Sequence, residues 1–191
     1  MGMPLPMDER ITLSAQLIKR ARVFYDIWWF YEGADTRPLI RDTMDRYSEF
    51  FRFDTHAHFV SMVVHLAGLF ENRRDTINFT ALIREAAASE LFPSETLAQA
   101  QDVIKEIQNL PSKLAILRSN LFAHRSDSLS YTEAFQKADV TPNQLRDLIG
   151  AGLRIANILL LARRLPEQFF DELSREDAER LLHDLTQTKG S

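Results

Sequence analysis

Apolar side chains recur at helical spacing along almost the whole chain, and strand-like alternation bounded by turns occurs nowhere in it. The clearest run lies between residues 56 and 74, where apolar residues repeat every three or four positions. Its members are Phe59, Met62, Val63, Leu66, Leu69 and Phe70. The pattern predicts an all-α fold, a single-domain bundle of about six to eight helices that spans residues 1–191.

Helix-capping residues and prolines divide the chain into its expected helices. Asn78 is a predicted N-cap, and the segment from Thr141 to Gln144 has the sequence of a capping box with proline in the first turn. Asp8 and Ser94 are predicted to cap two further helices. The expected helices cover residues 8–33, 38–53, 56–74, 79–89, 95–110, 112–124, 142–164 and a short final segment from 174.

Burial can be predicted for some of these segments. The expected helix at 142–164 is apolar nearly all round at 152–161, so it is predicted to be the central buried helix. The N-terminal helices, within residues 8–52, are less distinctive. A long, polar, irregular connection is expected after His124, and the tail at 186–191 is expected to be frayed.

Composition excludes several kinds of site. The chain has no cysteine, which removes disulfides, thiolate nucleophiles and cysteine-based zinc sites. It has only six glycines, which argues against a glycine-rich phosphate-binding loop. Its net charge of −4 is unlike that of a general nucleic-acid binder, which is usually basic. A role in binding RNA or DNA must therefore come from a local patch.

The most apolar runs, residues 59–70 and 155–162, are shorter than the roughly 18 apolar residues that a membrane span needs. The N-terminus has no basic run followed by an apolar stretch, so no signal peptide is predicted. We therefore expect a cytoplasmic protein that does not enter a membrane.

The histidines predict no metal site, and no cofactor motif occurs. His56 and His58 are two residues apart on one expected helix and so point to roughly opposite faces. His58 and His65 share a face, but about 10 Å of helix separates them, which is too far for one metal ion. We expect these side chains at the surface or at the edge of the core.

The aromatic run at 24–31 allows more than one interpretation. Phe24, Trp28 and Tyr31 line one helical face, and such a stripe could stack nucleobases. However, Asp26 and Glu32 lie nearby and basic residues are few. Packing in the core or at a dimer contact is therefore favoured over base stacking.

The stretch from Pro111 to Ser126 is a local positive island, because it contains Lys113, Arg118 and Arg125 and no acidic residue. It also contains His124, the one histidine beside an arginine. On an ideal helix, Arg118 and His124 would point about 120° apart. They can converge if the helix ends near Ala123, or if two copies of the chain form the site across a two-fold axis.

This pair of residue types suits the cleavage of RNA. A histidine near its ordinary pKa can take the proton of a ribose 2′-OH, and an arginine can hold the phosphate. The products would be a 2′,3′-cyclic phosphate and a free 5′-OH, and the chemistry needs no metal. The alternative is structural: His124 and its arginine neighbours would complement the dipole at a helix C-terminus and cap free carbonyls.

The segment "LRSNLFAHRSD", within an all-α chain, resembles the signature of the HEPN superfamily, here an arginine, five residues and a histidine. Within that superfamily it is most similar to the abortive-infection U-type (AbiU2-like) group. The flanking segments "HLAGLFENRRDTINFTALI" and "DVTPNQLRDLIGAGLRIANILL" also resemble that group, so the likeness covers roughly residues 55–162.

This resemblance implies a HEPN-like bundle, usually a homodimer, in which the arginine and histidine meet at the dimer interface. Many HEPN proteins are metal-independent endoribonucleases that act as toxins or in phage defence, and others only bind. By position, Arg118 and His124 would be the catalytic residues of the motif region 111–127. RNA is then the expected substrate, and an antitoxin or another protein is a possible partner. The expected supporting or RNA-binding residues are Asn120, Arg125, Lys113, Ser119 and Asp127.

The chain departs from the family pattern at two positions. Ser119 stands directly after the arginine, where the family often has asparagine, and Asn120 comes one residue later. The aspartate that usually follows the histidine and arginine is displaced by Ser126 to Asp127. These departures concern the support of the transition state and the orientation of His124. They favour the second interpretation, a non-catalytic helical interaction module.

Overall fold

The computed structural model describes residues 5–71, 76–89, 91–123 and 131–187, and these residues form nine helices and no strand. The predicted all-α bundle is confirmed, with one helix more than the upper end of the expected number. The helices are α1 (Met7–Glu32), α2 (Arg37–Arg46), α3 (Ser48–Phe70), α4 (Phe79–Ala88), α5 (Ser94–Glu106), α6 (Leu110–Ala123), α7 (Tyr131–Ala138), α8 (Pro142–Ala162) and α9 (Leu173–Gln187).

Several predicted boundaries are wrong. The third helix was expected to end at residue 74 and the fifth at residue 110, but α3 ends at Phe70 and α5 at Glu106. The second helix was expected to continue to residue 53, but α2 ends at Arg46 and α3 begins at Ser48. The reason is that Phe51 and Thr55 are buried and continue the four-residue spacing that leads to Phe59. The connection after His124 is also less irregular than expected, because α7 occupies residues 131–138 of it.

Two of the four predicted N-caps, Asn78 and Thr141, are confirmed, and Asp8 and Ser94 are not caps. The side chain of Asn78 accepts a hydrogen bond of 2.8 Å from the backbone N–H of Ala81. Thr141 and Gln144 form the complete capping box at the start of α8. Asp8 is not a cap, however: it lies inside the first turn of α1, and its carboxylate accepts a 2.6 Å hydrogen bond from Arg163. α5 begins at Ser94 itself, directly after Pro93.

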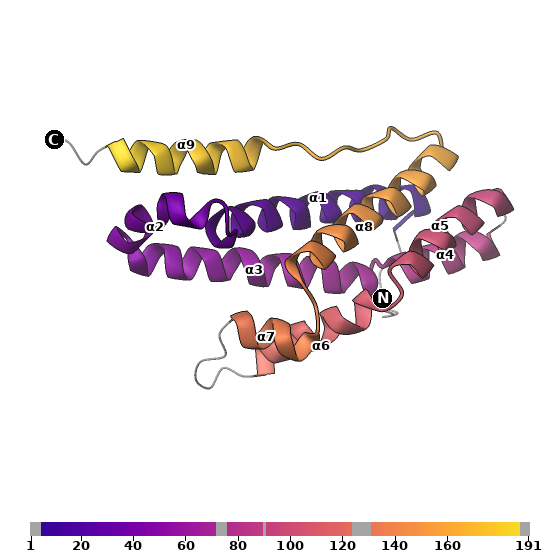
Figure 1. Cartoon of the computed structure of the whole chain (residues 1–191). Coiled ribbons are helices and arrows are strands. Elements are labelled where there is room, and N and C mark those ends of the chain that lie inside the picture. The colour runs from indigo at the N-terminus through magenta and orange to yellow at the C-terminus, as the bar shows by residue number, and fades with distance from the viewer. Residues whose placement is uncertain (1–4, 72–75, 90, 124–130, 188–191) are drawn as a thin grey trace.

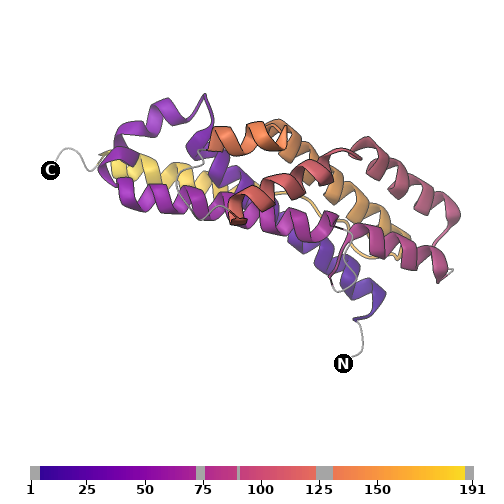
Figure 2. The same cartoon turned by 90° about the horizontal axis from the view of Figure 1, so that it is seen from below.

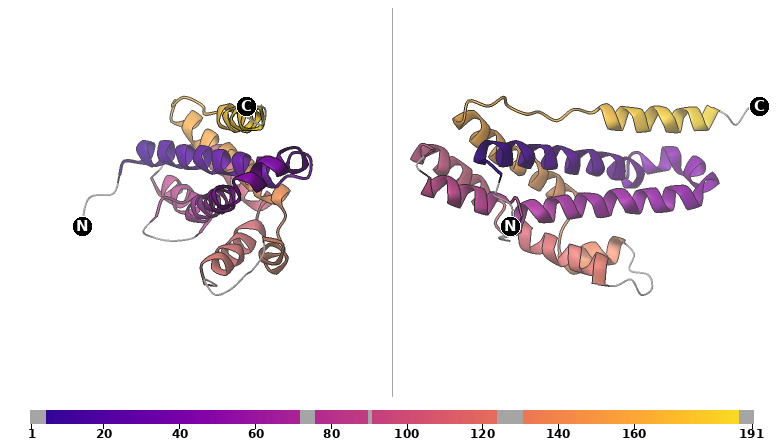
Figure 3. Two further views of the ribbon diagram at one scale, coloured as in Figure 1. Left: turned by 90° about the vertical axis from the view of Figure 1, so that its left-hand side faces the viewer. Right: turned by 180° about the vertical axis from the view of Figure 1, so that it is seen from behind.

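α1 is the central helix, and the prediction that the helix at 142–164 holds this place is wrong. α1 packs against α2, α3, α4, α8 and α9 (Figure 1). α8 is buried on the side that faces α1 and α5, but Arg154 and Leu161 are exposed on its other side. The end-on view in Figure 3 shows α9 on one side of the α1 and α3 pair and α6 with α7 on the opposite side.

The crossing of α1 and α8 depends on Gly152. A Cβ atom added at Gly152 would lie 2.4 Å from Cδ1 of Ile18 and 3.3 Å from the ring of Phe70. Both Ile18 and Gly152 are buried. The two helices can therefore approach this closely because residue 152 has no side chain.

The C-terminal helix closes a second, smaller core. Leu182 of α9 is buried against Phe30, Tyr31, Ile40 and Phe51. The hydroxyl groups of Thr43 and Thr186 lie 3.0 Å apart, which joins α2 to the last turn of α9. Residues 186 and 187, which were expected in the frayed tail, belong to α9, and residues 188–191 lie outside the described part.

Among the described helices, none is long and apolar enough to cross a membrane. α6 and α7 form a pair, and Figure 2 shows α6 running alongside the C-terminal half of α3. This arrangement places α6, which carries Arg118, on the side of the bundle that lies away from α9.

A pair of glycine substitutions in α8 tests the α1 crossing. Gly150 has nothing within 4 Å of an added Cβ, so Gly150→Ala should stabilise the protein by up to about 1 kcal/mol through helix propensity alone. Gly152→Ala has the same propensity gain but must displace Ile18, so it should be about 1–3 kcal/mol less stable than Gly150→Ala. Urea unfolding of both variants measures the difference, and equal stabilities would contradict the close crossing.

Candidate functional site

Arg118 lies on α6, a helix that follows α5 after a short turn. α5 ends at Glu106, and α6 begins at Leu110 with Pro111 in its first turn, as expected for a proline that cannot continue a helix. Leu114 and Leu117 are buried in the main core and anchor α6. Arg118, the next residue, is thereby held at the edge of the core with 35% of its side chain exposed.

Arg118 forms an ion pair with Glu71. Its guanidinium donates a hydrogen bond to the carboxylate of Glu71, which stands directly after the last residue of α3. The Glu71 side chain is 22% exposed, so the pair is partly open to solvent. The predicted phosphate-binding arginine is thus already held by an anionic group, in a position that solvent can reach.

Lys113 also has an acidic partner. Its ammonium group donates hydrogen bonds to the backbone carbonyl and to the carboxylate of Asp139, the latter at 2.6 Å. Asp139 lies in the turn between α7 and α8 and has a positive φ of 51°. Both described cations of the positive island are therefore matched by acids from distant parts of the sequence. An island that contains no acid in sequence need not be a positive surface in the folded chain.

The remaining predicted site residues are described only in part. Ser119 is exposed on α6, and Asn120 follows it in the same helix, with its backbone described. His124, Arg125 and Asp127 lie outside the described residues. Whether Arg118 and His124 converge is therefore still a prediction.

A large groove of about 1250 Å³ lies between α8 and the α5–α6 turn. It mixes charges of both signs, and two of its cations are paired: Lys113 with Asp139, and Arg154 with Glu106. Arg118 is not among its lining residues. The groove therefore does not join the predicted site to a common cavity.

The aromatic run at 24–31 mostly packs inside the bundle, as predicted. Trp28 is 2% and Tyr31 4% exposed, whereas Trp29 remains 36% exposed. The phenol of Tyr31 donates a 3.1 Å hydrogen bond to Asp54. Burial, and then the Asp54 carboxylate, raise the pKa of Tyr31, so this phenol is a neutral donor and not a base.

The histidines of α3 have local partners. Nδ1 of His58 lies 2.8 Å from the backbone oxygen of Asp54, and Nδ1 of His65 lies 2.7 Å from that of Ser61. Both rings also contact Phe24. Their positions at the edge of the core agree with the prediction.

Glu71 is the residue that sequence reasoning missed. Its signal was its place in "LFENRR", the first acidic residue after the apolar run of α3. Only the packing of α6 against the end of α3 reveals that it meets Arg118.

The fold and the Arg118 edge of α6 agree with the resemblance noted in the sequence. Arg118 lies on α6, which is followed by α7, α8 and α9 among the described helices. The family model described as AbiU2, an HEPN group, matches residues 8–181, and the chain belongs to that family. Comparison with curated proteins and with solved structures gave no match.

The Arg118–Glu71 contact should contribute little to stability. A double-mutant cycle of Arg118→Ala and Glu71→Ala should give a coupling of about 0.2–1 kcal/mol, because both side chains are partly exposed. The exposed pair Asp102–Lys105 provides the control, with a coupling near the lower end of that range. Urea unfolding measures both, and a much larger coupling would show that Arg118 is mainly a structural residue.

Proposed function

We propose that this AbiU2-family protein is a metal-independent endoribonuclease of phage defence, acting in abortive infection or in a toxin–antitoxin pair. The observation that supports this most is the state of Arg118. Its guanidinium lies at a partly exposed edge and already binds a carboxylate, an anion that a phosphate group can replace. Arginine suits this exchange, because its planar fork matches both anions.

In this proposal Arg118 holds the scissile phosphate and stabilises its charge in the transition state. His124 takes the proton from the ribose 2′-OH, and the 2′-oxygen attacks phosphorus. The bond from phosphorus to the 5′-oxygen then breaks, and the leaving oxygen receives a proton. Asn120, Ser119 and Asp127 are proposed to support these two residues. Lys113 and Arg125 would bind neighbouring phosphates.

Glu71 has a positioning role in the same proposal. Its carboxylate holds Arg118 at the surface until the phosphate of RNA takes its place. Arg118 and Glu71 must separate for this exchange, and their partial exposure makes the separation inexpensive.

We propose that the active form is a homodimer, and an apolar stripe on α3 supports it. The stripe consists of Phe50, Phe53, Ala57, Val60, Val64 and Gly68, which share one helical face at spacings of three and four residues. Phe50 is 60%, Phe53 75% and Val64 44% exposed. Phe53 and Glu71 also lie on the same face, because 18 residues complete five helical turns at about 100° each.

The stripe is suited to pairing with a second copy of α3 in the antiparallel direction. Its large residues lie near one end, and Gly68, which has nothing within 4 Å of an added Cβ, lies near the other. An antiparallel pair sets Phe50 of one chain opposite Gly68 of its partner. Such a dimer would place the Arg118–Glu71 pair at the border of the interface.

The setting follows from the same proposal. A single HEPN-like domain with these properties would act in the cytoplasm, where RNA is its substrate. An antitoxin or another protein partner would restrain it.

A second candidate function is a non-catalytic, dimeric interaction module. The specific observation in its favour is that Arg118 and Lys113 are both neutralised within the chain, as structural cations would be. In that case Arg118 and His124 would serve stability or dimerisation. The two functions differ in what His124→Ala changes: activity in the first, and melting temperature or dimer affinity in the second.

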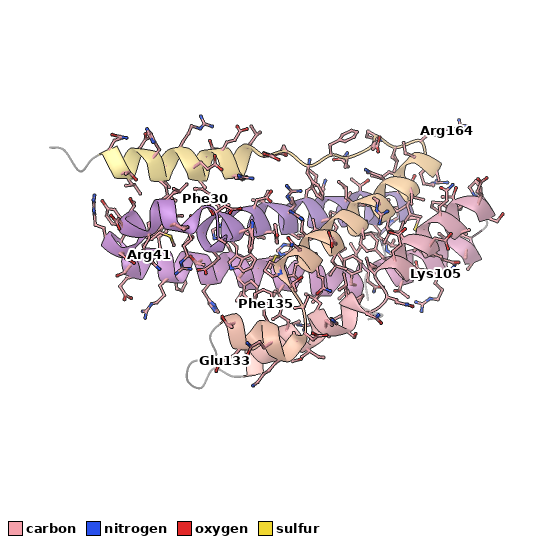
Figure 4. The ribbon with its side chains drawn as sticks, in the orientation of Figure 1. Phe30, Arg41, Lys105, Glu133, Phe135 and Arg164 are labelled. Atoms are coloured by element: carbon pink, nitrogen blue, oxygen red, sulfur yellow. The ribbon has the colours of Figure 1, made fainter. Side chains whose placement is uncertain are left out.

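Cleavage of RNA in the presence of EDTA tests the first function. Arg118→Ala should lower the rate by about 10²–10³-fold and His124→Ala by about 10²–10⁴-fold, and neither should lower the melting temperature by more than a few degrees. Lys105→Ala, at an exposed cation near the end of α5 (Figure 4), is the control and should leave the rate unchanged. No cleavage by the wild type, or equal cleavage by all four proteins, excludes this function.

The dimer is tested by Phe53→Glu. Phe53 is the most exposed large residue of the α3 stripe, and a charge buried there should convert the protein to a monomer, because an unpaired interfacial charge is costly. Light scattering after gel filtration measures the mass. Leu161→Glu on α8, also at an exposed apolar residue (56%), should leave the dimer intact. A Phe53→Glu variant that remains dimeric rules out the α3 stripe as the interface.

A further inference from the structure

A cleft of about 560 Å³ opens between the end of α1, α7 and the start of α8. This volume falls within the roughly 300–1,000 Å³ range of small-molecule sites. Trp28 and Phe135 form its aromatic floor, with ring centroids 5.8 Å apart, and Trp29 is a further aromatic residue in its lining. Figure 4 shows Phe135 on the side of α7 that faces the long helices.

The indole of Trp29 is held in place although it is 36% exposed. The ring of Tyr25 lies nearly parallel to it, at 13° and with 6.4 Å between centroids, and Trp28 contacts it at 5.7 Å. Gly33 makes room for it, since an added Cβ would lie 3.3 Å from the indole and 2.7 Å from the backbone oxygen of Trp29. A flat aromatic surface that is ordered before binding loses little entropy when a second ring stacks on it.

The rest of the lining supplies hydrogen-bonding groups. Glu32, Thr132 and Gln136 lie around the aromatic floor, and Pro142 belongs to the same lining. The carboxylate of Glu32 already pairs with Arg37, and that of Asp139 with Lys113. Each carboxylate has further lone pairs, so it can accept an N–H group while it keeps its cation.

From these observations we propose that the cleft binds one unpaired nucleobase, which stacks on Trp29 and meets the polar groups of α1 and α7 at its edge. A nucleobase has a flat π face and a rim of donors and acceptors, which matches this lining. This proposal rests on the ribonuclease function, because it takes the base to belong to a single-stranded RNA substrate. α7 begins at residue 131, shortly after the motif region 111–127, so a base held here would select where RNA is cut.

Binding of adenosine 5′-monophosphate (AMP) tests the cleft independently of catalysis. The two tryptophans give two indole N–H resonances, and Trp29→Phe assigns them while keeping an aromatic face. The Trp29 resonance should shift saturably with AMP and not with ribose 5-phosphate. By calorimetry, Trp29→Leu should weaken AMP binding by about fivefold to a hundredfold, and Trp29→Phe by much less. Phe169→Leu, at a phenylalanine that is 66% exposed and does not line the cleft, should bind AMP as the wild type does.

The outcomes separate this proposal from the ribonuclease function. If AMP binds at Trp29 while RNA is not cleaved, the nucleobase site stands and the ribonuclease function fails. If a four-nucleotide RNA binds more tightly than AMP and Arg118→Ala removes that gain, the base comes from RNA; equal affinities identify a free nucleotide as the ligand. If AMP shifts the Trp29 resonance no more than ribose 5-phosphate does, or if Trp29→Leu binds AMP normally, the proposal is wrong even where RNA is cleaved.

Discussion

The close crossing of α1 and α8 at Gly152 is the constraint on which the rest of the bundle depends. Because residue 152 has no side chain, Ile18 of α1 and Phe70 of α3 lie close to the backbone of α8, and α1 and α8 pack tightly together. α3 packs along α1, and α6 packs on α3. Through this sequence of contacts, one missing Cβ in α8 contributes to the position of Arg118 beside the end of α3.

Much of this fold could be predicted from local signals. The capping box at Thr141 and the N-cap at Asn78 are local hydrogen-bond patterns, so the helices that they begin were placed correctly. The division between α2 and α3 was not predicted correctly, because it depends on the burial of Phe51 in the small core that α9 completes. The centrality of α1 could not be predicted either, because α8 is the more apolar helix and only the packing shows that the other helices surround α1.

The site shows a similar limit. Arg118 and Lys113 were recognisable as cations in a stretch without acids, but their partners Glu71 and Asp139 come from 47 and 26 residues away. The charges of neighbouring residues in the sequence therefore did not predict the net charge of this part of the surface. The exposure of the Trp29 indole could not be predicted, because it belongs to an aromatic run for which core packing was the favoured interpretation. Only the placement of α7 and α8 forms a cleft beside it.

Taken as a proposal, the function rests on one chemical claim: Arg118 and His124 cleave RNA by attack of its own 2′-oxygen. The ends of the products test this most directly. After incubation with a defined single-stranded RNA in EDTA, mass spectrometry of the fragments should find a 2′,3′-cyclic phosphate on one side of each cut and a 5′-OH on the other. Fragments that carry a 3′-OH and a 5′-phosphate would contradict the account, because those ends require attack by water and not by the ribose.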